Sequence, residues 1–117
     1  MKLSPTFAPA FKRDIKRLQK KRIPLTELDE VIELILANTP EAHMILRQRH
    51  RMHSLKGTWA GTRECHVANT GDWLLIWMTT VSTAFFMRTG THAEVFRSDP
   101  PAIPQADPAD APTEREG

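Results

Sequence analysis

Residues 61–90 read GTRECHVANTGDWLLIWMTTVSTAFFMRTG and hold three extended segments separated by two short turns. In the first segment, residues 61–68, successive side chains alternate between two faces, as they do in a β-strand. Cys65 and Val67 fall on one face, which we assign to the core, and His66 falls on the other. The alternation therefore predicts a half-buried strand with a histidine on its outer face.

Two further strands follow the first. Residues 69–72 (NTGD) are turn formers, and residues 73–78 (WLLIWM) are apolar on both faces, as in a central strand. Residues 83–89 (TAFFMRT) form the third predicted strand. Short turns between successive strands are typical of an antiparallel meander. Residues 4–8 are a candidate edge strand, although the prolines in and beside this segment are unfavourable within a sheet.

The residues before the meander are predicted to form two helices. Phe11, Ile15 and Leu18 recur at helical spacing, and lysines and arginines fill most positions between them. A second periodic stretch runs from Thr26 to Ala37, where Asn-Thr-Pro is a stop signal. Two helices joined by so short a turn should pack as a hairpin. The predicted fold class is α+β, with an N-terminal helix hairpin packed on one face of a small antiparallel sheet.

The chain of 117 residues fits one domain followed by a tail. We predict a domain over residues 1–97 and a disordered, acidic, proline-rich tail over residues 98–117. Residues 99–117 hold five of the nine prolines and one large aliphatic residue, so they cannot bury enough apolar surface to offset their ordering entropy. The alternative is that the acidic tail folds back on the domain as an electrostatic cover.

The formal net charge of +2 conceals a division along the chain. Residues 99–117 carry five acidic side chains and one basic side chain, so residues 1–98 carry a net charge of +6. A basic domain favours an anionic partner, with nucleic acid the leading candidate. The alternative is a charged surface that serves only solubility.

Other features of the sequence bear on location. The longest apolar run, residues 73–78, has six residues, whereas a membrane span needs about 20. Charged residues from Lys12 onward interrupt the early apolar residues, so we expect no signal peptide. Cys65 is the single cysteine and cannot form an internal disulfide. We therefore expect a cytoplasmic protein with no membrane partner.

The candidate functional residues lie around the predicted meander. His53 precedes the first strand, His66 lies on its outer face, Asp72 closes the following turn, and His92 comes just after the last strand. The predicted sheet could gather these four side chains around one exposed face and its edge. Histidine and carboxylate suit acid–base chemistry near neutral pH, and RNA cleavage needs a base for the 2′-OH and an acid for the leaving 5′-oxygen.

Each of these residues also has an ordinary structural interpretation. A histidine in a small domain is usually a solvated or hydrogen-bonded surface group, and Asp72 is a common turn residue. Trp73 and Phe96 suit a core or the anchoring of a chain end. The spacing of His43, His50 and His53 matches no strong zinc pattern. Taken alone, the residues predict a small basic α+β domain with candidate acid–base groups.

Three runs of residues resemble a known family. They are H-x-L-x-G-x-W-x-G-x-R-x-x-H-V in residues 53–67, D-W-x-x-I in residues 72–76 and R-T-G-T-H-x-x-x-F in residues 88–96. This order is similar to that of the YafQ branch of the RelE/ParE toxin superfamily, over roughly residues 7–97. Several residues in fixed order across three elements are more specific than any one short motif.

The resemblance implies a toxin of a type II toxin–antitoxin pair, an endoribonuclease that cuts messenger RNA in the ribosomal A site. The family's catalytic set falls on His53, His66, Asp72 and His92. We expect His92 to be the general acid and either His53 or His66 the general base, with Asp72 orienting a histidine or holding its protonated form. The implied partners are the ribosome, messenger RNA and a small dimeric DNA-binding antitoxin.

The resemblance also suggests residues that contact RNA. Arg88 and Lys56 are expected to bind phosphate, Arg88 through a bidentate contact. Trp73 and Phe96 are expected to stack on bases or to form walls of the site. The resemblance implies no metal and no other cofactor.

Two alternatives stay open. One is a non-enzymatic binder of gyrase like the ParE branch, which generally lacks this set of histidines. The other is an inactive toxin remnant that acts only through its antitoxin.

Overall fold

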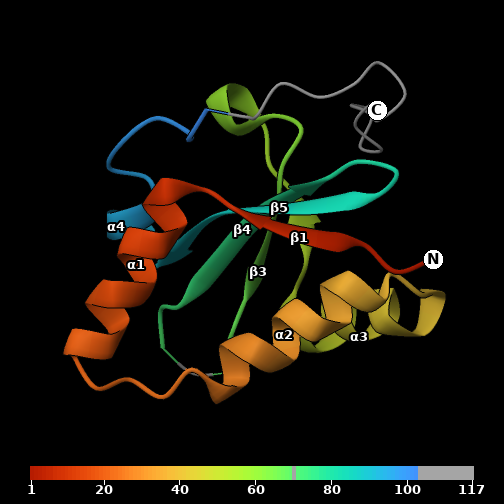
Figure 1. Cartoon of the computed structure of the whole chain (residues 1–117), viewed down its shortest axis with the longest axis horizontal. Coiled ribbons are helices and arrows are strands. Elements are labelled where there is room, and N and C mark those ends of the chain that lie inside the picture. The colour runs from red at the N-terminus through yellow and green to blue at the C-terminus, as the bar shows by residue number, and fades with distance from the viewer. Residues whose placement is uncertain (70, 103–117) are drawn as a thin grey trace.

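The computed structural model describes residues 1–69 and 71–102 and shows helices packed on one mixed β-sheet (Figure 1). In chain order the elements are β1 (Ser4–Phe7), α1 (Pro9–Lys20), α2 (Thr26–Ala37), α3 (Pro40–His50), β2 (His53–Ser54), the 3-10 helix η1 (Gly57–Trp59), β3 (Arg63–His66), β4 (Leu74–Thr79), β5 (Thr83–Gly90) and α4 (His92–Val95). The α+β class predicted from the sequence is confirmed.

The sheet has the strand order β1-β5-β4-β3-β2. The pairs β3–β4 and β4–β5 are antiparallel, which confirms the predicted meander. The candidate strand at residues 4–8 forms β1, but it pairs in parallel with β5, so the prediction of an entirely antiparallel sheet was wrong. A parallel pair needs a long connection between its strands, and here α1, α2, α3 and three other strands lie between β1 and β5.

The core lies along the central strands. Every residue of β4 is buried, as the run of apolar residues on both faces predicted. Cys65 and Val67 of the first meander strand are also buried, which confirms the face assigned to them. Burial raises the pKa of the Cys65 thiol, so this side chain behaves as a small apolar core residue and not as a nucleophile.

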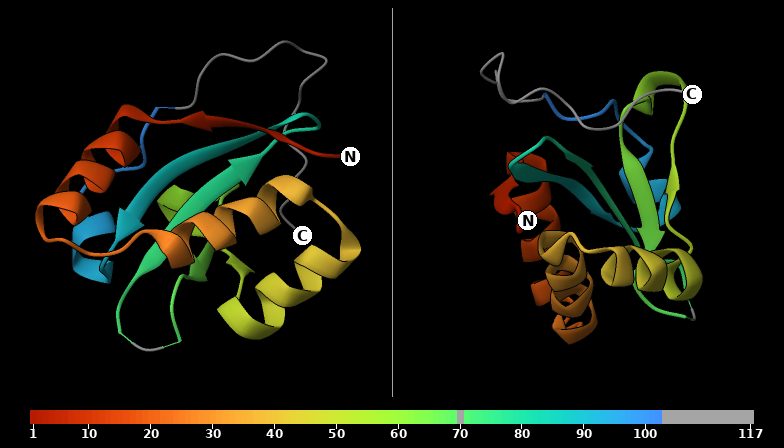
Figure 2. Two further views of the ribbon diagram at one scale, coloured as in Figure 1. Left: turned by 60° about the horizontal axis from the view of Figure 1, so that its bottom comes forward. Right: turned by 90° about the vertical axis from the view of Figure 1, so that its right-hand side faces the viewer.

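The helices depart from the predicted hairpin. α1 packs on β5, whereas α2 packs on α3, a helix that was not predicted (Figure 2). Asn-Thr-Pro was interpreted as a stop signal for α2, but its last two residues also begin α3. Thr39 caps α3 by accepting a hydrogen bond from the backbone N–H of Ala42 at 3.0 Å, and Pro40 occupies the first turn, where its missing N–H costs nothing.

Among the described residues, no helix has the length and apolar character needed to cross a bilayer. Most of the predicted tail, residues 103–117, lies outside the residues that the structure describes, so its disorder stays a prediction.

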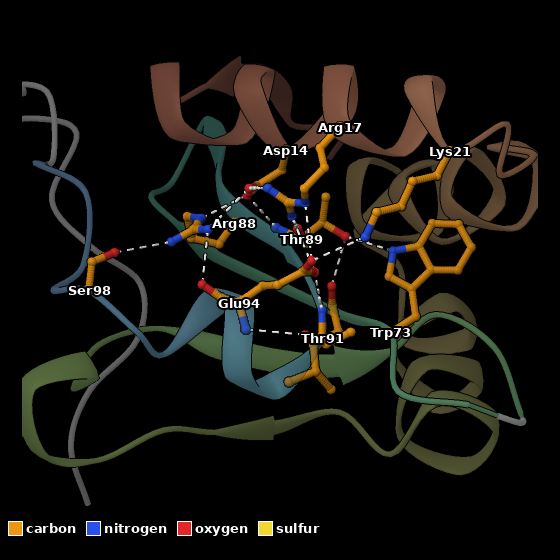
Figure 3. A network of polar contacts seen from close by, with 10 residues as sticks. Asp14, Arg17, Lys21, Trp73, Arg88, Thr89, Thr91, Glu94 and Ser98 are labelled. Carbon is orange, nitrogen blue, oxygen red and sulfur yellow. Dashed lines mark hydrogen bonds and ion pairs between the residues drawn. The ribbon is translucent and has the colours of Figure 1, made fainter.

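A buried carboxylate joins α1 to the sheet. The pairing of β1 with β5 ends at Phe86, and beyond this point Asp14 of α1 takes over the edge of β5. Asp14 is only 1% exposed and accepts hydrogen bonds from the backbone N–H of Thr89 at 3.0 Å and from Arg17 at 2.9 Å. It also accepts two from the Arg88 guanidinium, at 2.7 and 3.1 Å. These contacts satisfy a strand edge that would otherwise be left unpaired (Figure 3).

The same network reaches α4. Arg17 donates a hydrogen bond to Glu94 at 3.4 Å, and Lys21 forms an ion pair with Glu94 at 3.6 Å (Figure 3). Glu94 in turn accepts the backbone N–H of Thr91 at 2.9 Å, while the Thr91 hydroxyl accepts the N–H of Glu94. This capping box fixes the first turn of α4 and lowers the pKa of the Glu94 carboxyl, chiefly through the Thr91 N–H.

Asp14→Ala should lower the free energy of unfolding by about 3–5 kcal/mol, because removing one partner leaves the Arg88 charge buried and unpaired. Urea denaturation followed by circular dichroism measures this loss. The matched control is Lys12→Ala on the exposed face of the same helix, which should change stability by less than about 0.5 kcal/mol. Equal stability of the two variants would show that the Asp14 network does not hold α1 to the sheet.

Candidate active site

Strand ends bring Asp72 and His92 together. Asp72 lies in the turn before β4 and His92 begins α4 just after β5, and the pairing of Leu74 with Gly90 places these ends side by side. The His92 ring nitrogen Nδ1 lies 2.6 Å from Asp72 Oδ1. The His92 backbone N–H also donates to both Asp72 carboxylate oxygens at 3.1 Å.

This contact fixes the chemistry of the His92–Asp72 pair. Because Asp72 is an acceptor, Nδ1 of His92 carries a proton and Nε2 is left to exchange protons with a ligand. The hydrogen bond from the His92 side chain lowers the pKa of the Asp72 carboxyl, which therefore stays ionised at neutral pH. Both side chains are about half exposed, so a polymer could reach them from solvent.

His66 faces His92 from the end of β3. The centroids of the two rings are 6.3 Å apart. Partial burial and the nearby positive charge of Arg51 lower the pKa of His66, and His92 and His53 add to this effect, while Glu64 opposes it. His66 is thus held in the neutral form, which can accept a proton. Its backbone carbonyl lies 2.8 Å from Nδ1 of His50, which ties the end of β3 to α3.

His53 joins the cluster through Glu64. The two residues are paired across β2 and β3, and His53 Nε2 lies 3.2 Å from Glu64 Oε1. The other ring nitrogen, Nδ1, lies 2.9 Å from the carbonyl oxygen of Arg51. The structure therefore brings all four residues predicted to be catalytic to one side of the sheet.

Aromatic rings form one wall of this site. The Phe96 ring lies 6.1 Å from the His92 ring and makes an edge-on contact with Trp59, whose ring centroid is 5.4 Å away. Trp59 is buried, whereas Phe96 is 39% exposed and presents its ring to solvent. Lys56, also predicted to bind RNA, is exposed at the start of the turn that leads to Trp59.

Two residues predicted to contact RNA lie elsewhere. The Arg88 guanidinium is buried against Asp14 and donates also to the carbonyl of Glu94 at 3.2 Å, so its donors are engaged within the protein. The Trp73 indole N–H donates to Thr89 at 2.9 Å, and the ring lies beside Lys21 under α1 (Figure 3). A phosphate contact by Arg88 and base stacking by Trp73 therefore do not fit this geometry, because Arg88 holds α1 to β5 and the Trp73 indole is bonded to β5.

Several residues that support the site were not predicted, although the sequence holds a signal for some of them. Thr91 and Glu94 have the spacing of a capping box. Asp14 falls three residues after Phe11 and four before Leu18, so it shares their buried face despite its charge. Glu64 lies two residues before His66 and so shares its face of β3, but nothing in the sequence marks its contact with His53.

Among the described residues, no group of three or more His, Cys, Asp or Glu side chains is arranged to hold a metal ion. The described part of the site offers acid–base groups from four elements, with His66 neutral and His92 paired to a carboxylate.

Comparisons with known proteins show the family of this chain. Residues 3–97 match a family model described as the bacterial toxin of the type II toxin–antitoxin system, YafQ. The mRNA interferase toxin YafQ of Escherichia coli K12 is 33% identical over 90 residues, which cover 77% of this chain and 91% of that protein.

Solved structures give the same result. The crystal structure of YafQ from E. coli BL21(DE3) has a TM-score of 0.68 and 30% identity, covering 80% of this chain and 98% of the other. The toxin in the E. coli DinJ–YafQ toxin–antitoxin complex has a TM-score of 0.69 and 30% identity, covering 82% and 99%. A copper-bound mutant toxin from Helicobacter pylori has a TM-score of 0.70 and 28% identity, covering 80% and 99%.

The fold and the site thus define a bacterial toxin of a type II toxin–antitoxin system. Within that class, the chain belongs to the YafQ toxin family. The family match covers residues 3–97, so residues 98–117 lie outside it.

Burial and the charge of Arg51 both lower the pKa of His66 below its ordinary value. Arg51→Gln should raise the pKa of His66, because removing a nearby positive charge favours the protonated ring. Two-dimensional NMR of the histidine rings across pH measures this value. The matched control is Arg49→Gln on α3, which should leave it unchanged. An equal effect of the two substitutions would contradict the local role of Arg51.

Proposed function

We propose that this YafQ-family toxin, like the mRNA interferases it is similar to, cuts messenger RNA on the ribosome by general acid–base catalysis carried by His66 and His92. The observation that supports this proposal is the pairing of His92 with Asp72 opposite a histidine whose pKa is lowered. A neutral histidine can act as the base, and a histidine whose Nδ1 is held by a carboxylate can act as the acid through its other nitrogen.

The proposed reaction uses the 2′-OH of the RNA as its nucleophile. Neutral His66 takes the 2′-OH proton while the 2′-oxygen forms a bond to phosphorus. The bond from phosphorus to the 5′-oxygen breaks, and His92 Nε2 gives its proton to that oxygen. The products are a 2′,3′-cyclic phosphate and a free 5′-OH, and the two histidines end with exchanged protonation states.

Asp72 has a supporting role in this reaction. Its ionised carboxylate lies 2.6 Å from Nδ1 of His92, so it orients the ring and pairs by charge with the imidazolium that donates the proton. The exposed ring of Phe96, beside His92, is placed to stack on a base next to the cut phosphate. Lys56 supplies an exposed positive charge on the chain segment between His53 and Trp59.

The outer face of α1 supports an interaction with ribosomal RNA. Its exposed cations are Lys12, Arg13, Lys16 and Lys20. No carboxylate among the described residues pairs with them, so they are available to neutralise phosphates. Because bacterial ribosomes lie in the cytoplasm, the proposed cleavage in the ribosomal A site takes place there.

We propose a cognate antitoxin, a small dimeric DNA-binding protein, as the other partner. Support comes from the family, which is the toxin half of type II pairs, and from the E. coli YafQ structures solved as complexes with DinJ. A net positive domain suits a partner with acidic segments.

His92→Ala should lower messenger cleavage by about 10²–10⁴-fold, because the leaving 5′-oxygen loses its proton donor. Induced expression in a bacterial host, with messenger 5′ ends mapped against ribosome position, measures this loss. The wild-type chain should give cuts inside codons at the A site.

The control is His43→Ala, a histidine on α3 outside the cluster, which should cut like the wild type. Growth arrest without such cuts would contradict the proposed nuclease activity. A folded, fully toxic His92→Ala protein would contradict the assignment of His92 as the general acid.

A further inference from the structure

The last described residues lie beside the first turn of α1. After α4, Ser98 accepts a hydrogen bond from the Arg88 guanidinium at 3.4 Å, which ties this segment to the Asp14 network (Figure 3). Pro101 and Ala102 then line a pocket of about 560 Å³ together with residues of the first turn of α1. The chain that follows Ala102 therefore starts from the N-terminal end of this helix.

The outer face of α1 carries a stripe of four exposed cations, the α1 stripe, formed by Lys12, Arg13, Lys16 and Lys20. At about 100° per residue, these four positions fall within an arc of about 100° on the helix. Lys12, Lys16 and Lys20 follow one another at a spacing of four residues, where like charges repel and disfavour the helix. No carboxylate within residues 1–69 and 71–102 forms an ion pair with any of the four. The α1 stripe therefore lacks a counter-charge in this part of the chain.

The sequence beyond Ala102 has the opposite charge. Residues 103–117, the acidic segment, hold four acidic side chains and one basic side chain, which gives a net charge of −3. A chain of this length reaches at most about 50 Å when extended, whereas the 12 residues of α1 form a helix about 18 Å long. From its start at Ala102, the acidic segment is long enough to cover the whole α1 stripe.

We infer that the acidic segment binds the α1 stripe and competes there with the phosphates of RNA. The covalent tether keeps the segment at an effective concentration on the order of 1 mM, so weak charge pairing is enough to occupy the stripe without a fixed conformation. Such a contact is electrostatic, and salt therefore weakens it. The competition with RNA rests on the proposed function, in which the same stripe binds ribosomal RNA.

The tether favours α1 over the other basic helix. α3 also exposes two cations, Arg47 and Arg49. However, α1 packs on β5, whereas α3 packs on α2 and on β3, which is two strands farther along the sheet. The α3 cations are thus farther from the start of the acidic segment, and they serve as an internal control for charge alone.

A spin label on the acidic segment tests the contact itself. Ala111→Cys accepts a nitroxide label, while the native Cys65 is buried and does not react. At low salt the label should broaden the backbone amide NMR signals of α1 and leave those of α3 sharp. The broadening should disappear at high salt, because screening releases the segment from the stripe.

Neutral side chains in the acidic segment test the competition. The test variant of the full chain carries Asp107→Asn, Asp110→Asn, Glu114→Gln and Glu116→Gln. Its control loses four exposed carboxylates of α2 and α3 through Glu27→Gln, Glu30→Gln, Glu33→Gln and Glu41→Gln, so the two variants have the same net charge. The probe is a short fluorescent 2′-O-methyl RNA, which has no free 2′-OH for the cleavage reaction.

At low salt the test variant should bind this RNA about 10-fold more tightly than the control variant, because its segment no longer occupies the stripe. The difference should shrink as salt rises, since salt also removes the segment from the stripe in the control.

Three results would overturn the inference: α1 signals that the label leaves unchanged at low salt, equal broadening of α1 and α3, or equal RNA binding by the two variants. The proposed function fails separately. If the label broadens α1 and the test variant binds RNA more tightly, while the wild type does not cut messenger on ribosomes, the contact stands and the nuclease does not.

Discussion

Strand β1 pairs with only the first half of β5, and the carboxylate of Asp14 takes over the edge that β1 leaves. The Thr89 N–H needs an acceptor there, and a helix can offer one only through a side chain. Asp14 supplies it and at the same time pairs with Arg88, which gives α1 a fixed position on the sheet. Through Arg17 the network continues to Glu94 and so determines where α4 begins. The position of His92 at the start of α4 therefore depends on how Asp14 of α1 satisfies the edge of β5.

A glycine makes this connection compact. Gly90 has a φ of +149°, and a Cβ placed there would lie 2.6 Å from Glu94 and 2.8 Å from Arg17. A larger residue would push apart the groups that join α1 to α4. Residues 88–92 (R-T-G-T-H) thus combine an ion pair, a helix cap and a close backbone approach, and each of these contacts stabilises the fold.

The three histidines of this site have different surroundings, which differ in hydrogen-bond partners, nearby charges and burial. His92 faces a carboxylate on one nitrogen, His53 faces acceptors on both, and His66 is partly buried among positive charges. Under the proposed roles, these surroundings yield an acid, His92, and a base, His66, from one residue type. The sequence analysis identified all four groups but left His53 and His66 open as bases, because hydrogen-bond partners across strands do not show in the spacing of one chain.

The sequence by itself determined the central strands, the amphipathic first helix and the set of histidines. Their signals are local, since alternation, helical spacing and motif order need only neighbouring residues. It did not determine α3, whose start signal coincides with the end of α2, nor the parallel pairing of β1, which depends on a partner about 80 residues away. Tertiary structure alone decided that Arg88 binds Asp14 of α1, that Trp73 binds Thr89 of β5 and that Glu64 contacts His53. A charged side chain has the same local pattern whether it binds a ligand or a buried partner, and only the folded chain brings that partner within hydrogen-bonding distance.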